Sequence, residues 1–136
     1  MAGYSGTPLP RKLGIKEGHR LALIDAPDAF DRTLGALPQG VETRRSARGR
    51  SDVMVCFVTR RAQLERRFGA LKRALEFDGG LWIAWPKRAS GVETDVTEDV
   101  VREVALANGL VDVKVCAVDD VWSGLRLVYR LEDRPA

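Results

Sequence analysis

The sequence has a single histidine, His19, and only two cysteines, Cys56 and Cys116, which lie far apart. Zinc sites need a set of several nitrogen, sulfur or carboxylate ligands at suitable spacing, so no zinc site is expected. The carboxylates between residues 93 and 99 could hold Mg²⁺, but helix capping and the helix dipole explain them without an ion. His19 could act as a general base, yet it sits in a turn before a predicted strand, with no nucleophile near it in sequence. We therefore predict no metal site and no catalytic residues.

Glycine-rich phosphate loops are absent as well, because neither a P-loop nor a Gly-x-Gly-x-x-Gly pattern occurs. No apolar run approaches the roughly 18 residues of a membrane span, and the N-terminus has no basic stretch followed by an apolar core. Both cysteines lie in apolar, strand-like runs and are expected to be small buried hydrophobes in a reducing compartment. They would form a disulfide only if their strands were close neighbours. We expect a cytoplasmic protein with no cofactor, no secretory signal and no membrane contact.

The chain has 136 residues, of which 45% are hydrophobic and 30% charged, as in a soluble globular protein. This length suits a single α/β domain over residues 1–136 and is too short for two domains. The charge is uneven: residues 1–90 hold 17 Lys and Arg against 9 Asp and Glu, whereas residues 91–136 hold 5 against 10. This division predicts one basic face and one acidic face.

The most informative stretch runs from Asp78 to Ser90. Leu81 to Trp85 is apolar at every position, which favours a strand covered on both sides, as in a parallel sheet between helices. Gly79 and Gly80 are expected to form a turn before this strand, and Pro86 to end it.

Periodicity and turn residues predict the remaining elements. Strands are expected at about 20–25, 41–45, 53–58, 110–118 and 122–130, and helices at about 29–34, 60–75 and 95–108. Asp28 and Asp95 are expected to cap the first and last of these helices. Residues 1–19 are expected to form an irregular arm, pinned to the domain by Leu9, Leu13 and Ile15. The order predicts a three-layer, Rossmann-like α/β fold: a mostly parallel sheet with a C-terminal antiparallel strand pair.

From residue 52 to 130 the chain resembles the second half of a class I S-adenosylmethionine-dependent methyltransferase. The resemblance rests on Asp78-Gly79-Gly80, on Asn108-Gly109-Leu110 and on the closing strand pair at 112–130. In that family the first strand ends in an acidic residue followed by a glycine-rich turn. Asp25 stands where the acid belongs, but Ala26-Pro27 follows it, and residues 42–48 offer mostly arginines where an acid would hold the ribose. The resemblance therefore implies the scaffold but not the cofactor site.

A second resemblance covers nearly the whole chain. Its signatures are Gly3-Tyr4-Ser5-Gly6-Thr7-Pro8-Leu9-Pro10 with Lys12-Leu13-Gly14-Ile15, and Gly80-Leu81-Trp82-Ile83-Ala84-Trp85-Pro86-Lys87. These are similar to a family of small bacterial proteins known only as a domain of unknown function. This resemblance implies no activity and no functional residues.

Ligands of open α/β sheets bind outside the carboxyl ends of the strands. The candidate ligand-binding residues at that edge are Asp25, Asp28, Arg60, Trp85, Lys87, Arg88 and Ser90. The basic side chains could hold a phosphate while the tryptophan stacks on a ring. The alternative is that Trp82 and Trp85 are core aromatics and that the basic residues are simply solvated.

A second basic region comprises Arg44, Arg45, Arg48 and Arg50, with the outer face of the helix at 60–75. Such a surface could track nucleic-acid phosphates. The small net charge, the lack of interleaved aromatics and the absence of a recognition motif argue against nucleic acid and favour a solvated basic face.

The leading functional hypothesis is a non-catalytic cytoplasmic binding or interaction protein on a degenerate methyltransferase-like scaffold, with any small ligand being anionic. The first alternative is a divergent enzyme that depends on S-adenosylmethionine or a nucleotide. The second is binding of a nucleic-acid or protein partner through the arginine-rich face. The identity of the ligand or partner stays open.

Overall fold

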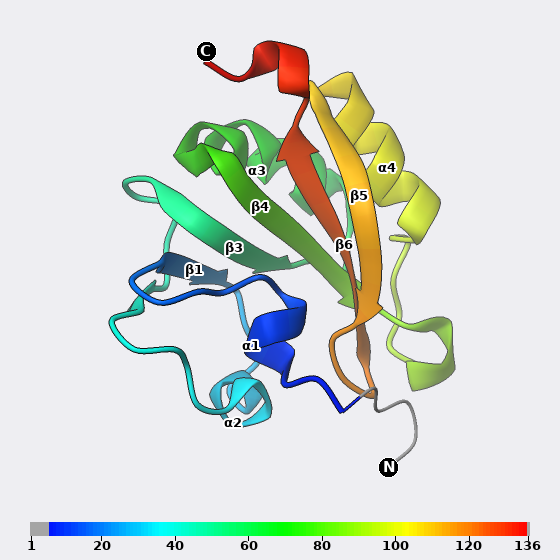
Figure 1. Ribbon diagram of the computed structural model, residues 1–136. Coiled ribbons are helices and arrows are strands. Elements are labelled where there is room, and N and C mark those ends of the chain that lie inside the picture. The colour runs from blue at the N-terminus through cyan, green and yellow to red at the C-terminus, as the bar shows by residue number, and fades with distance from the viewer. Residues whose placement is uncertain (1–5, 136) are drawn as a thin grey trace.

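A computed structural model describes residues 6–135, which form one mixed sheet between helices (Figure 1). The strands are β1 (Arg20–Ile24), β2 (Glu42–Arg44), β3 (Ser51–Phe57), β4 (Leu75–Pro86), β5 (Leu110–Ala117) and β6 (Trp122–Tyr129). The helices are α1 (Leu9–Lys12), α2 (Phe30–Leu34), α3 (Arg61–Ala74) and α4 (Glu98–Ala107), with short 3-10 turns η1 (Arg88–Ser90) and η2 (Leu131–Asp133). Tyr4 and Ser5 of the N-terminal signature lie outside the described residues.

The strands lie in the order β2-β1-β3-β4-β6-β5. The pairs from β2 to β4 are parallel, and β6 runs antiparallel to both β4 and β5. The predicted mostly parallel sheet with a closing antiparallel pair is confirmed. The chain crosses from one side of β1 to the other on its way from β2 to β3, so the topological switch point lies between the carboxyl ends of β1 and β3.

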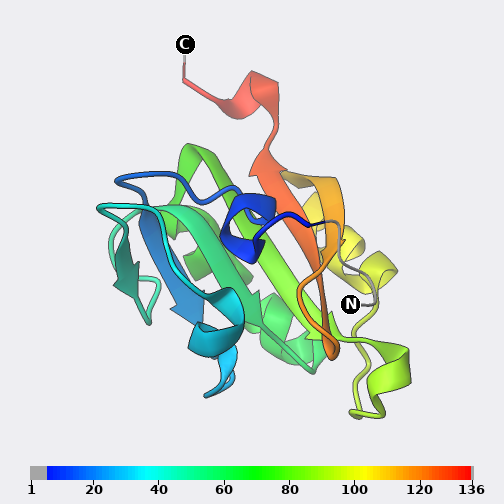
Figure 2. The same ribbon diagram turned by 60° about the horizontal axis from the view of Figure 1, so that its bottom comes forward.

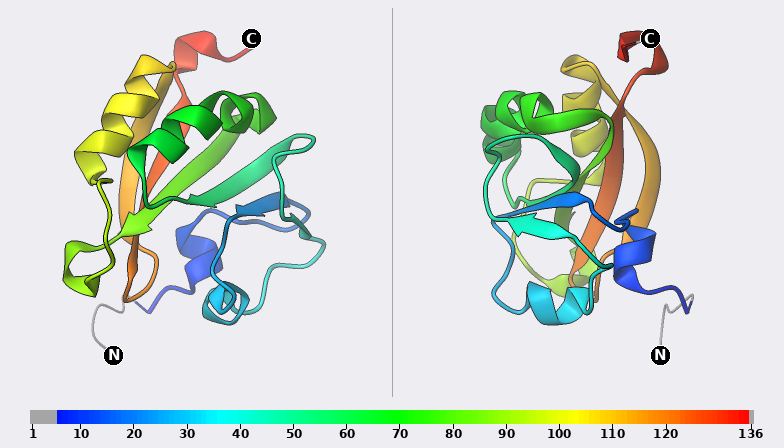
Figure 3. Two further views of the ribbon diagram at one scale, coloured as in Figure 1. Left: turned by 180° about the vertical axis from the view of Figure 1, so that it is seen from behind. Right: turned by 60° about the vertical axis from the view of Figure 1, so that its left-hand side comes forward.

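The two longest helices, α3 and α4, cover the same face of the sheet, as Figure 3 shows from behind. The predicted stripe on α3 is confirmed, because Leu64, Phe68 and Leu71 are buried against the sheet. Val101 and Val104 of α4 join the same cluster. This face therefore carries an apolar core formed by two amphipathic helices.

The opposite face is covered by the N-terminal arm, with α1, and by α2 (Figure 2). Leu13 and Ile15 of the arm are buried, as predicted, and pack with Phe30 of α2. The buried Trp82 indole donates a hydrogen bond of 2.9 Å to the carbonyl oxygen of Leu13. This bond satisfies the ring N–H and fixes the arm to β4. The prediction that the arm lacks regular structure missed α1.

Residues 79 and 80 do not form the expected turn, because β4 begins directly after α3 at Leu75 and runs through both glycines. A Cβ atom on Gly79 would lie 2.5 Å from the carbonyl oxygen of Asp52 on β3. The register between the two strands also shifts there, between Ser51 and Val53. The glycines are thus needed for a close approach of two backbones within the sheet, where sequence alone indicated a reversal of direction.

The expected helix caps are also corrected. Thr97 caps α4, since its side chain accepts a hydrogen bond of 3.2 Å from the backbone N–H of Val100. The residue before α2 is Ala29, which provides no side-chain cap, so Asp28 does not fill that role. The two cysteines are free: Cys56 lies on β3 and Cys116 on β5, with β4 and β6 between these strands.

Candidate functional site

The carboxyl ends of β1, β3 and β4 meet at one edge of the sheet, where the sequence predicts a ligand. Asp25 follows β1 and has a φ of 56°, the one positive φ of a non-glycine residue within 6–135. Aspartate tolerates this left-handed conformation better than most residues do. Asp25 therefore begins the turn at the carboxyl end of β1, next to the switch point between β1 and β3.

Internal contacts bridge that switch point. The Asp25 carboxylate forms an ion pair of 2.7 Å with Arg67 of α3. It also accepts a 3.4 Å hydrogen bond from Gln63, whose carbonyl oxygen accepts another of 3.4 Å from the backbone N–H of Thr59. Burial raises the pKa of the Cys56 thiol just below to about 12, against the opposing charge of Arg67. The polar groups at the switch point thus bind one another, and the thiol stays protonated at neutral pH.

The loop after β4 covers the carboxyl end of β3 and the start of α3. Thr94 donates a hydrogen bond of 2.6 Å to the carbonyl oxygen of Thr59, which brings the loop across the end of β3. The Asp95 carboxylate then accepts a bond of 2.7 Å from the backbone N–H of Arg61, at the start of α3. A helix N-terminus at the end of a parallel strand is a natural anion site. Here the protein fills it with its own carboxylate, so Asp95 serves α3 and not the predicted α4.

The other predicted ligand residues divide into two groups. Trp85 is only 7% exposed and belongs to the core beneath α3 and α4, which leaves little of its indole for a ligand. Ser90 is held in the η1 turn, where its hydroxyl donates to the carbonyl oxygen of Lys87 at 2.6 Å. In contrast, the side chains of Arg60, Lys87 and Arg88 make no hydrogen bond or ion pair with any residue from 6 to 135. Asp28 is exposed beyond β1.

The arginines of the predicted basic loop mostly have structural partners. Arg44 donates to the carbonyl oxygen of Arg48 at 2.9 Å. Arg45 pairs with Asp31 at 2.8 Å, and Arg50 pairs with Glu76 at 3.2 Å. Within the described residues, the Arg48 side chain is the one of the four without such a contact. Most of the loop's positive charge is therefore tied to partners within the protein, among them Asp31 of α2 and Glu76 of β4.

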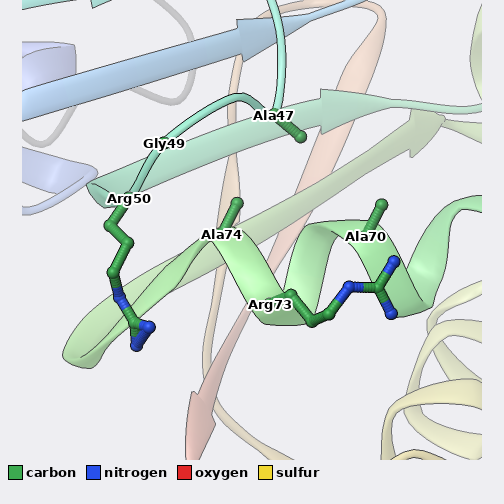
Figure 4. A pocket seen from close by; sticks show the side chains of 6 residues that line it. All are labelled: Ala47, Gly49, Arg50, Ala70, Arg73 and Ala74. Carbon is green, nitrogen blue, oxygen red and sulfur yellow. The ribbon is translucent and has the colours of Figure 1, made fainter.

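Beside this loop runs a shallow groove that the sequence did not reveal. It has a volume of about 320 Å³ and is lined by Ala47, Gly49, Arg50, Ala70, Arg73 and Ala74. Figure 4 shows Ala70, Arg73 and Ala74 on one stretch of α3, facing the loop that carries Ala47. The sequence signal for it is the pair of small residues Ala70 and Ala74, one helical turn apart on α3.

Two classes of site are not found in the described part of the chain. From residue 6 to residue 135, no group of three or more His, Cys, Asp or Glu side chains could hold a metal ion. In the same range no helix is long and apolar enough to cross a membrane.

Three solved structures of methyltransferases or putative methyltransferases have a similar architecture. A putative type 11 methyltransferase from Sulfolobus solfataricus matches 100% of this chain and 98% of its own, with a TM-score of 0.59 at 12% identity. A putative methyltransferase from Thermoplasma acidophilum matches 92% of this chain and 75% of its own, with a TM-score of 0.58 at 8% identity. The magnesium protoporphyrin IX methyltransferase of Synechocystis, solved with bound S-adenosylmethionine, matches 90% of this chain and 74% of its own, with a TM-score of 0.56 at 11% identity.

The chain has a methyltransferase-like fold. At these identities the likeness establishes the fold alone. No family model and no curated protein matches the sequence, so the resemblance to a bacterial family of unknown function stays a prediction. Within this methyltransferase-like fold, the turn after β1 carries Ala26 and Pro27, and Asp25 at its start is paired with Arg67 of α3.

Proposed function

We propose that this chain is a small, cytoplasmic, non-catalytic binding protein on a methyltransferase-like scaffold, and that it does not use S-adenosylmethionine. The observation that supports this proposal is the state of the carboxyl edge. Asp25, which would face a cofactor, is paired with Arg67 at 2.7 Å, and the N-terminus of α3 is occupied by Asp95. A cofactor entering here would have to displace contacts that already satisfy the polar groups, at the cost of leaving charges unpaired.

The same edge retains unpaired positive charge, which supports an anionic ligand. Arg60 follows β3, and Lys87 and Arg88 follow the adjacent β4, so three cations without internal partners flank one corner of the sheet. Arginine and lysine side chains at such a corner can form charge-assisted hydrogen bonds with phosphate or carboxylate oxygens. Binding would rest on charge, because Trp85 is buried and offers no stacking platform.

Calorimetric titration with S-adenosylmethionine and S-adenosylhomocysteine tests the first part. No binding is expected at concentrations up to the millimolar range, for the wild type or for Arg67→Ala, because Ala26 and Pro27 still crowd the turn. Micromolar affinity of the wild type for either compound would overturn the non-catalytic reading and favour the alternative, a divergent methyltransferase.

Native mass spectrometry tests the second part. Purified protein is compared under native and denaturing conditions, and a bound species that appears only under native conditions identifies the ligand. The double variant Lys87→Ala/Arg88→Ala should lose it, whereas Arg73→Ala, an unpaired cation far along α3, should retain it. A ligand that survives the double variant would place the site elsewhere.

A second candidate function is nucleic-acid binding, favoured by the groove between the basic loop and α3. Arg73 lines this groove, and Arg48 lies in the adjoining loop between the lining residues Ala47 and Gly49. Neither side chain makes a hydrogen bond or ion pair with any residue from 6 to 135. Binding of a single-stranded oligonucleotide should then weaken with rising salt, and Arg48→Gln/Arg73→Gln should reduce the salt slope by about 2, one for each lost phosphate contact. The matched control is Arg11→Gln on α1. Equal binding by the double variant and the control would exclude this surface.

A further inference from the structure

On the side of the sheet that carries α1, one region is covered by no helix formed from residues 6–135. In Figure 1, α1 lies over the lower part of this face, and no helix lies over the C-terminal half of β6 or over the adjacent part of β5. Arg126 projects from the middle of β6 on this side. It lies opposite Trp82 of β4, whose indole binds the N-terminal arm on the same face.

Arg126 is in an unfavourable environment for a charged group. Its side chain is half-buried, and it makes no hydrogen bond or ion pair with any residue from 6 to 135. Burial, and then the charge of Arg134, lower the pKa of its guanidinium. A partly desolvated cation without an acceptor destabilises the folded chain, and buried arginines are ordinarily paired for this reason.

The neighbouring charges have the same sign. Lys114 of β5 lies directly opposite Arg126 in the strand register, so both side chains are on one face of the sheet. Arg134 lies near enough for its charge to act on Arg126, and its guanidinium donates to the carbonyl oxygen of Tyr129 at 3.0 Å. Like charges at directly opposed positions destabilise a strand pair. Lys114 alone can be understood as protection of the exposed edge strand β5, but Arg126 is on an inner strand and has no such role.

The backbone beneath Arg126 makes room for its guanidinium. A Cβ atom on Gly80 of β4 would lie 2.4 Å from Nε and 2.8 Å from Nη2 of Arg126. The guanidinium thus occupies the space that a side chain would fill, and is positioned at the sheet surface without an internal acceptor. The N–H groups of Arg126 are therefore available to donate hydrogen bonds to an oxygen atom of a bound ligand.

We infer that Lys114, Arg126 and Arg134 form a binding site for a phosphate monoester carried by a small molecule. The guanidinium of Arg126 offers paired N–H donors that match two phosphate oxygens, and Lys114 and Arg134 add charge. A phosphate monoester carries close to two negative charges at neutral pH, which matches a cluster of cations better than the single charge of a diester. The site lies on the sheet face and not at the carboxyl edge, so it is independent of the function proposed above.

The test uses the full chain and inorganic phosphate as the probe. Thermal unfolding is followed at increasing phosphate, with chloride at matched ionic strength as the reference, and the dissociation constant is measured by titration. Phosphate should raise the melting temperature of the wild type by more than chloride does, because it binds the folded state. Arg126→Leu, which keeps an apolar side chain over Gly80, should weaken phosphate binding roughly tenfold or more, the effect of losing a charged hydrogen bond.

Two further variants separate a binding role from a structural one. Lys114→Gln lies on the exposed edge and should also weaken phosphate binding while it folds normally. Arg32→Gln, an exposed arginine of α2, should bind phosphate as the wild type does. In phosphate-free buffer, Arg126→Leu should be at least as stable as the wild type, because a desolvated and repelled charge is removed.

Several results would overturn the inference. These are a wild-type melting temperature that responds equally to phosphate and chloride, or unchanged phosphate affinity in both Arg126→Leu and Lys114→Gln. Binding of a single-stranded oligonucleotide that phosphate does not displace, with no binding of phosphate itself, would also reject a monoester site and indicate a polymer backbone instead. If Arg126→Leu does not fold, Lys114→Gln decides the matter alone.

Discussion

Replacing Gly79 by alanine should destabilise the protein by about 1–3 kcal/mol, the range for overpacking a well-packed interior. The new methyl carbon would lie 2.5 Å from the carbonyl oxygen of Asp52 and 3.1 Å from Cδ1 of Leu75. The first of these neighbours is backbone in the adjacent strand, so it can move only if β3 and β4 separate locally. The strain falls between two central strands, where β3 and β4 pair along most of their length.

Gly69→Ala on α3 is the matched control, and it should raise the free energy of unfolding where Gly79→Ala lowers it. The added carbon would meet only Nη1 of Arg73, at 3.3 Å, and this end of a flexible side chain can move away. Alanine in a helix interior is more stable than glycine by roughly 0.5–1 kcal/mol. Urea denaturation of the two variants and the wild type, compared at a common slope, measures both effects. A Gly79→Ala protein as stable as the wild type would refute the close approach of β3 and β4, and would favour the turn that sequence alone predicts.

Three further variants probe other contacts. Asp95→Ala should lower the free energy of unfolding by about 0.5–2 kcal/mol, the usual value of a side-chain cap, because the N–H of Arg61 loses its acceptor; chemical denaturation would measure it, and an unchanged midpoint would contradict the cap. Trp82→Phe should cost about 1–3 kcal/mol by leaving the carbonyl of Leu13 without its buried donor, and should speed proteolysis of the N-terminal arm; an arm cleaved at the wild-type rate would show that this bond does not hold it. The free energy of unfolding should fall as the pH rises above 9, by at most about 1.4 kcal/mol per pH unit from Cys56, because the thiol ionises near 9 in the unfolded chain but only at about 12 in the folded one. Cys56→Ala should reduce that slope, and an identical slope in variant and wild type would rule out this contribution.

Periodicity predicts the elements of this fold well because burial repeats along the chain. Covered faces can be predicted from the stripe of Leu64, Phe68 and Leu71 on α3 and from the fully apolar run of β4, because these residues are the buried ones. The turn at Gly79 and Gly80 was wrong for a physical reason: glycine permits both a reversal and a close approach, and the sequence does not distinguish them. The sequence predicts Asp95 as a cap of α4, but its carboxylate binds the N-terminus of α3, because a carboxylate can cap any N-terminus that the fold brings within reach.

The candidate site is less accessible to sequence reasoning, because pairing between distant charges decides which residues remain free. Arg45 and Arg50 are arginines of the same loop as Arg48, yet only the fold gives the first two their partners Asp31 and Glu76. Arg126 presents the reverse case, since its position in an alternating strand gave no reason to single it out. Its unpaired state depends on the fold, which sets Lys114 opposite it and gives it no hydrogen bond or ion pair with any residue from 6 to 135.

The strand order also has a consequence for synthesis of the chain. β5 pairs only with β6 in the described sheet, and β6 follows the other five described strands in the sequence. Until residues 122–129 leave the ribosome, β5 has no partner and β4 presents an open edge beside its apolar run from Leu81 to Trp85. Open apolar edges are templates for wrong pairing between chains. We therefore expect chains truncated before Trp122 to keep this open edge, because β6 is missing from its place between β4 and β5, and to accumulate as aggregates.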